Sequence, residues 1–411
     1  MTVVVTCGHT RAGLAAVRGL GRAGVAVAVA APQRPALAMW SRYATTTLLV
    51  PEATLEARRF ANVVVEEVTG RAADGALAST DAALWALSRW REGLPASALA
   101  MLPPHEAVVV ALDRLALRDR ARSLDVACVP MFRIKGVADV ERVLQRLQQE
   151  HASSDGRLAA LVRPIVPSFE REDGTRRVVT AIPVESLGEL RRLLYDREEL
   201  VDGGCLIEPR PAGDYLGYGA VCRHGEVIAE VFQQRLRERG DLSGVSTLAR
   251  TIPIDDDMRA AARTLLKGLK FTGPCLVEFT RADDGVVRLV SLIPRLWGSL
   301  GLASLAGVNV PWLALRVARG EDVAPGLVAR PGQVWRWVVG DLEVLVHRLG
   351  RLVSRVEGRG VIRRRAESLR ELLDIRDVWR ARPDVFELDD PLPSTLELQQ
   401  RLEEARGILK R

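Results

Sequence analysis

The residues best suited to chemistry lie in one stretch of the chain, residues 275–301. Two apolar runs, 275–280 and 286–292, flank a short polar turn, and this pattern predicts an antiparallel hairpin. The first run carries one acid, Glu278, inside an apolar strand, and Arg295 follows the second run directly after a proline. A buried carboxylate near a guanidinium suits a site for a metal ion and a polyphosphate, because hard cations prefer oxygen ligands and phosphates prefer forked donors.

This stretch resembles the ATP-grasp ligases, especially their carboxylate–amine ligase branch. In that family the matching hairpin carries a magnesium-binding Glu, followed by a Glu-x-Asn-Pro-Arg sequence. Glu278 matches the first acid, and residues 294–299 match the tail. Ser291 and Ile293 stand where the family has its second Glu and its Asn. The resemblance thus implies ATP and Mg²⁺ as cofactors, although only one of the three expected metal ligands, Glu278, is present.

Three further arginines match positions that contact phosphate in the family. Arg114 lies in a predicted helical run, 106–124, and Arg163 ends an apolar strand; the family has lysine at both positions. Arg235 begins an Arg-Leu-Arg segment that the family shares. The resemblance implies that all three bind ATP phosphates, and that Arg235 and Arg295 serve the transferring phosphoryl group or the acyl phosphate. For Arg114 the sequence alone favours a solvated helix face instead.

Two loops complete the expected nucleotide site. A predicted strand ends in Glu208 and leads into Pro209 and Pro211, where the family strand pairs with the adenine edge. Glu208 fits that frame, but each proline lacks an N–H that could donate to adenine. Gly244 and Ser246 belong to a Gly-Val-Ser loop that the family also has, and the backbone N–H groups of such a loop suit an anion. A plain β-turn is the alternative for that loop.

Two other features leave alternatives open. The loop 167–177 is rich in charge and glycine, and it either closes over the phosphates, as the family implies, or is a mobile surface loop. Asp81 precedes a predicted helix, so it is either the N-cap of that helix or an acid that faces the site.

The order of elements predicts an α/β fold. The chain opens with a strand, a helix and a second strand in residues 2–30, and the resemblance extends to an Asp-Pro-Leu-Pro segment near the end. It implies a doubly wound N-terminal domain, two α+β ATP-grasp subdomains and a C-terminal extension. The predicted boundaries are 1–102, 103–203, 204–325 and 326–411.

Composition excludes several protein classes. The 411 residues are 48% apolar and 27% charged, and no run approaches the roughly 20 apolar residues of a membrane span. The start of the chain lacks a signal-peptide pattern, so we expect a cytoplasmic protein without membrane contact. The five widely spaced cysteines predict buried thiols, and the arginine-rich stretch 348–370 lacks the interleaved aromatics of a nucleic-acid surface.

Two functions from different classes follow from these observations. The first is an ATP-dependent ligase that activates a small carboxylate as an acyl phosphate and transfers it to an amine. The second is a catalytically inactive ATP-grasp-fold scaffold that binds a nucleotide or a protein partner, because several family residues are replaced at one site. A homodimer is compatible with either function.

Overall fold

The structure is a computed structural model, and it describes residues 1–152, 157–164, 181–197, 200–201, 203–210, 213–239, 244–353 and 376–409. Side chains are described in these ranges except at 164, 346–353, 376–377 and 405–409. The predicted loop 167–177, most of the stretch 348–370 and Pro211 lie outside the described residues. Within the described part of the chain, no helix is both long and apolar enough to cross a membrane.

The N-terminal domain is built on a parallel four-stranded sheet in the order β3-β2-β1-β4. Its central strands are apolar and almost fully buried, as expected for a parallel sheet covered on both faces. The strands are β1 (Thr2–Val5), β2 (Ala26–Ala31), β3 (Thr46–Leu49) and β4 (Gly75–Leu77), and the main helices are α1 (Arg11–Arg22), α2 (Ala57–Gly70) and α3 (Asp81–Arg89).

A second four-stranded sheet, in the order β5-β8-β6-β7, forms a small α+β unit. All of its strand pairs are antiparallel, and two amphipathic helices pack their apolar faces into its core. Its elements are β5 (Phe132–Ile134), α7 (Val137–Glu150), β6 (Arg157–Pro164), β7 (Ile182–Ser186), α8 (Leu187–Asp196) and β8 (Cys205–Pro209).

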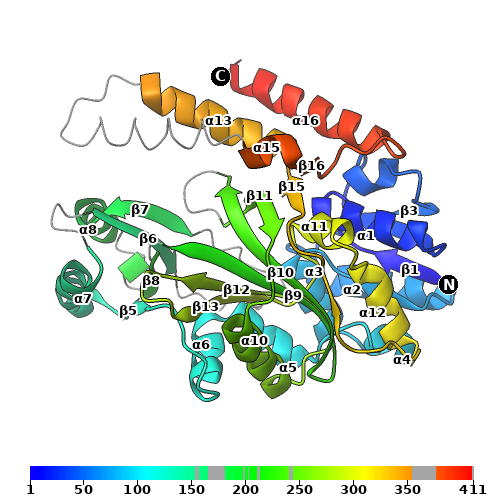
Figure 1. Cartoon of the computed structure of the whole chain (residues 1–411), viewed down its shortest axis with the longest axis horizontal. Coiled ribbons are helices and arrows are strands. Elements are labelled where there is room, and N and C mark those ends of the chain that lie inside the picture. The colour runs from blue at the N-terminus through cyan, green and yellow to red at the C-terminus, as the bar shows by residue number, and fades with distance from the viewer. Residues whose placement is uncertain are drawn as a thin grey trace.

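The largest sheet occupies the centre of the molecule (Figure 1). Its order is β13-β12-β9-β10-β11-β15-β16, with β14 paired beside β10. The antiparallel hairpin predicted from the runs 275–280 and 286–292 is confirmed, and Glu278 lies opposite Ser291 in it. The strands are β9 (Asp214–Arg223), β10 (Glu226–Glu238), β11 (Ser246–Thr251), β12 (Gly273–Arg281), β13 (Val287–Ile293), β14 (Leu327–Val328), β15 (Val334–Arg336) and β16 (Arg382–Pro383).

Helices cover this sheet on both faces. One apolar core joins it to α5 (His105–Leu112), α6 (Arg114–Arg122) and α10 (Asp256–Gly268). Another joins it to the N-terminal domain through α1, α11 (Leu300–Leu305) and α12 (Val310–Ala318). The remaining helices are η1 (Leu37–Trp40), α4 (Ala96–Leu99), α13 (Val338–Val353), α15 (Arg376–Arg380) and α16 (Leu392–Leu409).

The continuous helical run predicted for residues 106–124 is wrong. The backbone leaves the helical region at Asp113, with φ −96° and ψ 117°, and the run divides into α5 and α6. The Asp113 carboxylate accepts hydrogen bonds from the backbone N–H groups of Leu115 and Ala116, so it caps α6. Arg114 is therefore the first residue of a helix, and this position directs it toward the sheet.

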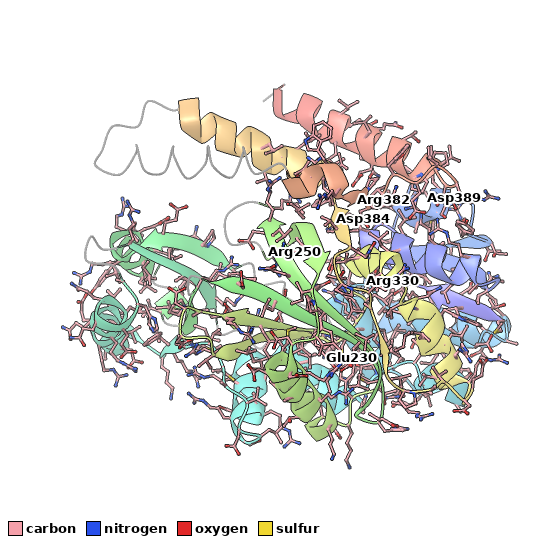
Figure 2. All side chains as sticks on the ribbon, viewed as in Figure 1. Glu230, Arg250, Arg330, Arg382, Asp384 and Asp389 are labelled. Atoms are coloured by element: carbon pink, nitrogen blue, oxygen red, sulfur yellow. The ribbon has the colours of Figure 1, made fainter. Side chains whose placement is uncertain are left out.

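The C-terminal region closes back on the N-terminal domain. The short strands β14, β15 and β16 continue the large sheet, and α16 then packs against η1. Asp384 and Asp389 lie on the segment that leads from β16 to α16 (Figure 2). The chain thus has the α/β architecture predicted from its sequence, while the four predicted domain boundaries remain predictions.

Candidate functional site

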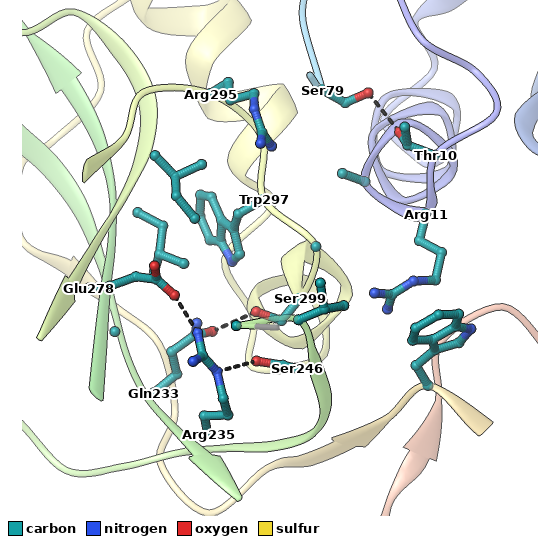
Figure 3. Close-up of a pocket in the computed structure, with 18 of the residues that line it drawn as sticks. Thr10, Arg11, Ser79, Gln233, Arg235, Ser246, Glu278, Arg295, Trp297 and Ser299 are labelled. Carbon is teal, nitrogen blue, oxygen red and sulfur yellow. Dashed lines mark hydrogen bonds and ion pairs between the residues drawn. The ribbon is translucent and has the colours of Figure 1, made fainter. Parts of the chain in front are cut away.

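A cavity of about 440 Å³ lies where three parts of the chain meet. The first turn of α1, with Arg11, forms one side, and strands β9, β10, β12 and β13 form another. The segment after β13, with Arg295, and helix α16 complete the wall. In Figure 3, Arg11 lies across this space from Arg235 and Glu278. Charged side chains from the N-terminal domain, the large sheet and the C-terminal region therefore face one cavity.

Glu278 is the centre of a closed group of polar side chains. The Ser291 hydroxyl donates to one carboxylate oxygen of Glu278, and the Arg235 guanidinium donates to the other. Arg235 also donates to the Ser246 hydroxyl at 3.1 Å (Figure 3). Its second terminal nitrogen lies 3.6 Å from Glu238. The sequence predicted Arg235, Ser246 and Glu278 as site residues, and the structure brings all three together.

The Gly244 N–H is not free to bind an anion in this arrangement. It donates to the Glu238 carboxylate at 3.1 Å. The same carboxylate accepts two hydrogen bonds from the Arg210 guanidinium, at 2.8 and 3.2 Å, and Arg210 stacks on the Tyr215 ring. Gly244 lies in the cavity wall, but an incoming phosphate would first have to displace Glu238.

A second charged group joins Arg114, Arg163 and Glu208. Arg163 donates to Glu208 at 2.9 Å, and Arg114 lies 3.7 Å from the other oxygen of that carboxylate. Arg114 also donates to the Val290 carbonyl on β13 at 2.7 Å, so it is not a solvated residue on a helix face. The structure brings these three predicted residues together, but none of them lines the 440 Å³ cavity.

This second group carries more positive than negative charge. Two guanidinium groups face one carboxylate, and burial together with the nearby Arg114 lowers the pKa of Arg163. The Glu208 oxygen nearer Arg114 is buried without a hydrogen bond. The group thus offers positive charge to a phosphate and one free acceptor to a ligand N–H, and these features fit a nucleotide.

Comparison with known proteins shows which fold this chain has. Residues 219–338 match a family model described as "ATP-grasp in the biosynthetic pathway with Ter operon". The N5-carboxyaminoimidazole synthetase from Staphylococcus aureus has a similar structure, with a TM-score of 0.60 and 13% sequence identity, over 85% of each chain. This chain is an ATP-grasp protein by fold. The fold that the sequence predicted is therefore confirmed.

Other ATP-grasp structures are similar over comparable lengths. An L-amino acid ligase from Bacillus licheniformis has a TM-score of 0.56 and 13% identity, over 81% of this chain and 78% of its own. A biotin carboxylase from Campylobacter jejuni has a TM-score of 0.58 and 12% identity, over 81% of this chain and 74% of its own. No curated protein matches the sequence. At such identities the likeness shows the fold alone.

The residues at Glu278 do not fit a divalent cation. Both oxygens of the Glu278 carboxylate already accept hydrogen bonds, one of them from the cationic Arg235. Ile293 lines the cavity where the ATP-grasp sequence pattern has an oxygen ligand, and it supplies none. Among the described residues, no three His, Cys, Asp or Glu side chains gather as a metal ligand set. A guanidinium thus occupies the position beside Glu278 where a hard cation would need oxygen ligands.

Arg295 is held at the cavity by an acid from the N-terminal domain. Its Nε donates to Asp81 at 2.6 Å, and one terminal nitrogen donates to the Leu296 carbonyl at 2.8 Å. The N-cap of α3 is Thr80, whose hydroxyl accepts from the Ala83 N–H. The N-cap alternative for Asp81 is therefore wrong, because Asp81 pairs with a residue of the site.

Several residues of the cavity wall were not predicted from the sequence. Gln233 lies behind Arg235 on β10 and accepts a hydrogen bond from Ser299 at 3.2 Å. Trp337 and Glu397 come from the C-terminal region. Glu397 lies on a helix with two further glutamates, Glu403 and Glu404, so no local pattern marks it. For Trp337 a signal did exist, since the sequence has two tryptophans, Trp335 and Trp337, close together near the end of the matched segment.

Proposed function

We propose that this ATP-grasp protein is an ATP-dependent ligase that activates a small carboxylate as an acyl phosphate and transfers the acyl group to an amine. One observation carries the proposal: Arg235 and Arg295 reach the same cavity from different elements, beside the group of Arg114, Arg163 and Glu208 that fits a nucleotide. Two of the similar structures are named as a synthetase and a ligase, which agrees with a bond-forming reaction.

The proposed reaction has two steps. A carboxylate oxygen of the substrate attacks the γ-phosphorus of ATP, the bond to the β-phosphate oxygen breaks, and ADP leaves. The amine then attacks the acyl carbon, the bond to the phosphate oxygen breaks, and inorganic phosphate leaves with the loss of one proton from the amine. Both steps develop negative charge on phosphoryl oxygens, and fixed guanidinium groups stabilise such charge.

The roles of the arginines follow from their positions. Arg114 and Arg163 would hold the nucleotide phosphates, with Glu208 as acceptor for a nucleotide N–H. Arg235 and Arg295 would hold the transferring phosphoryl group, and each would exchange its carboxylate partner for a phosphate oxygen. Asp81 is a positioning residue that keeps the Arg295 guanidinium at the cavity in the absence of substrate.

A second candidate is a scaffold that binds a nucleotide without turnover. The observation that favours it is the closed group around Glu278, in which Arg235 and Ser291 use both carboxylate oxygens. Binding to a protein partner or to a second copy of the chain is part of this candidate and stays a prediction.

Trapping with hydroxylamine tests the ligase. Hydroxylamine is a small neutral nucleophile that converts an acyl phosphate to a stable hydroxamate, so it reports the first step without knowledge of the natural amine. The protein would be incubated with ATP, with and without Mg²⁺, and with a panel of amino acids and other small carboxylates. We expect hydroxamate with at least one carboxylate, and a loss of roughly 10²–10³ in rate in Arg295→Gln.

Arg288→Gln is the matched control, because Arg288 lies on the same hairpin and pairs with Asp284 at the outer turn, away from the cavity. Hydroxamate formation by this variant should equal that of the wild type. No hydroxamate with any carboxylate, together with calorimetric binding of a non-hydrolysable ATP analogue, would favour the scaffold instead.

A further inference from the structure

Helix α16 places an unusual acid in the cavity wall. Glu397, Gln400, Arg401 and Glu404 of this helix line the cavity opposite the large sheet. These residues come from the C-terminal region, beyond residues 219–338 that match the family model. The C-terminal helix therefore supplies side chains to the cavity that the matched core does not contain.

The other charges that line the cavity are paired. Arg11 pairs with Asp384 at 2.9 Å and Arg295 pairs with Asp81 at 2.6 Å. On the opposite walls, the remaining pairs are Arg235 with Glu278 and Arg401 with Glu404. Of the three acids in the described cavity wall, Glu278 and Glu404 thus have a cationic partner.

Glu397 is the exception among these acids. No cationic nitrogen of the described residues lies within 4.0 Å of its carboxylate, and its hydrogen-bond partner is the neutral indole N–H of Trp337, at 2.7 Å. Burial raises the pKa of Glu397, since the charged form loses hydration that no ion pair replaces. An uncompensated carboxylate in a cavity is an attractive position for a cation.

The surroundings of Glu397 fix its orientation. The Trp337 side chain is 5% exposed, and the Arg11 guanidinium lies 3.9 Å from the centre of its ring. The indole N–H holds one oxygen of Glu397, and the other oxygen has no hydrogen-bond partner among the described residues. Arg11 and Arg401 lower the pKa of Glu397 from a distance, but neither forms an ion pair with it, because each is paired with other acids. A ligand that donates N–H groups and carries positive charge would satisfy it.

We propose that Glu397 binds the ammonium group of the acceptor amine and so selects acceptors that enter the cavity as cations. Before the second step the ammonium gives one proton to the Glu397 carboxylate, so that a neutral amine attacks the acyl carbon. This inference rests on the proposed ligase function, in which an amine is the second substrate. Arg235 and Arg295 lie on a different wall of the cavity from Glu397. The carboxylate substrate and the amine substrate would therefore bind to separate residues. The selected class is a small primary amine that is protonated at neutral pH.

Direct binding tests this assignment without catalysis. Ethylammonium, glycinamide hydrochloride and 1,2-diaminoethane dihydrochloride would be titrated into the full chain at pH 7, with calorimetry or ligand-observed NMR as the readout. We expect at least one of the three to bind the wild-type chain, and Glu397→Gln to weaken its binding at least tenfold. Glutamine keeps an oxygen for the Trp337 N–H, so the wall should retain its shape. Ethanol and acetamide, which carry no charge, should bind both proteins equally weakly.

Glu403→Gln is the matched control, because Glu403 is an exposed acid on α16 that does not line the cavity. It should bind the three ammonium probes as tightly as the wild type does. The assignment to Glu397 is overturned if no probe binds the wild type, if Glu397→Gln binds as well as the wild type, or if Glu403→Gln loses as much affinity. Failure of the ligase proposal appears elsewhere, as absence of hydroxamate in the wild-type trapping assay.

Discussion

Glu397 makes a pH-dependent contribution to stability whose sign follows from its environment. Burial raises the pKa of its carboxyl and Asp384 raises it further, while the hydrogen bond from Trp337 and the charges of Arg11 and Arg401 oppose the shift. The pKa of this carboxyl is about 4.3 in the unfolded chain and higher in the folded protein. At pH values between the two, the folded protein therefore binds more protons than the unfolded chain. The free energy of unfolding falls as pH rises through that window, because the folded state then has to hold a buried charge.

Glu397→Gln removes this titration and is expected to change stability in a pH-dependent way. At pH 7.5 the variant should melt at a higher temperature than the wild type, and the gap should close as pH falls toward 4. Melting curves between pH 4 and pH 8 measure the difference. A gap that is constant over this range would contradict the assigned burial of the charged carboxylate, as would a gap that widens toward low pH.

Single residues of the site could be predicted only where the sequence carries a motif. Arg235, Ser246 and Glu278 lie in recognisable segments, and the structure joins them. Their mutual pairing could not be predicted, because Arg235 and Glu278 are 43 residues apart and strand β9 separates their two strands in the sheet. Glu397 gave no signal at all, since nothing in the sequence distinguishes it from the exposed Glu403 and Glu404 on the same helix.

At the scale of elements, the capping of α6 controls the position of Arg114. The Asp113 carboxylate accepts from two backbone N–H groups, at 2.8 and 3.0 Å. Asp113→Ala should lower the free energy of unfolding by roughly 0.5–2 kcal/mol, because these donors lose their partner. Asp113→Asn should restore most of the stability. Urea unfolding of the three proteins measures the effect.

The control for this prediction lies at the other end of the same helix. Ser123 follows α6 and its exposed hydroxyl donates only to the Arg120 carbonyl. Ser123→Ala should change the free energy of unfolding by less than about 0.5 kcal/mol. Equal losses in Asp113→Ala and Ser123→Ala would mean that the cap does not stabilise α6.

The sequence predicted the existence of the helices and strands better than it predicted the residues at which they begin and end. Two apolar runs on either side of a polar turn predicted the hairpin of β12 and β13, and the structure confirms it. The break between α5 and α6 was missed because the run 106–124 keeps a helical composition throughout. The signal was Asp113, a preferred N-cap residue. The contact between Arg114 and the Val290 carbonyl joins residues 176 positions apart, and the sequence does not show it.

At the scale of the whole molecule, the two ends of the chain are joined by a buried ion pair. Arg18 on α1 is 2% exposed, and it donates to the Asp390 carboxylate at 2.9 Å. The same guanidinium donates to the carbonyls of Asp384, Val385 and Asp390. Ser41 and the Arg42 backbone N–H complete the partners of Asp390. The sequence predicted neither this contact nor its partners, because residues 372 positions apart meet only in the folded chain.

Asp390→Asn tests whether this ion pair holds α16 over the cavity. The substitution removes the buried carboxylate from Arg18 and leaves it only the partly exposed Glu387, at 3.3 Å. Loss of one partner of a buried pair costs up to roughly 3–5 kcal/mol. Asp389→Asn is the control, because its pair with Arg22 is exposed and the expected cost is below about 1 kcal/mol. Denaturant unfolding gives both values, and limited proteolysis reports release of α16.

Since α16 carries Glu397, the Asp390 variant should also lose affinity for the ammonium probes. This loss should be seen at concentrations of denaturant where the rest of the chain stays folded. If it unfolds no more easily than the Asp389 variant, the Arg18–Asp390 pair does not hold the C-terminal region in place.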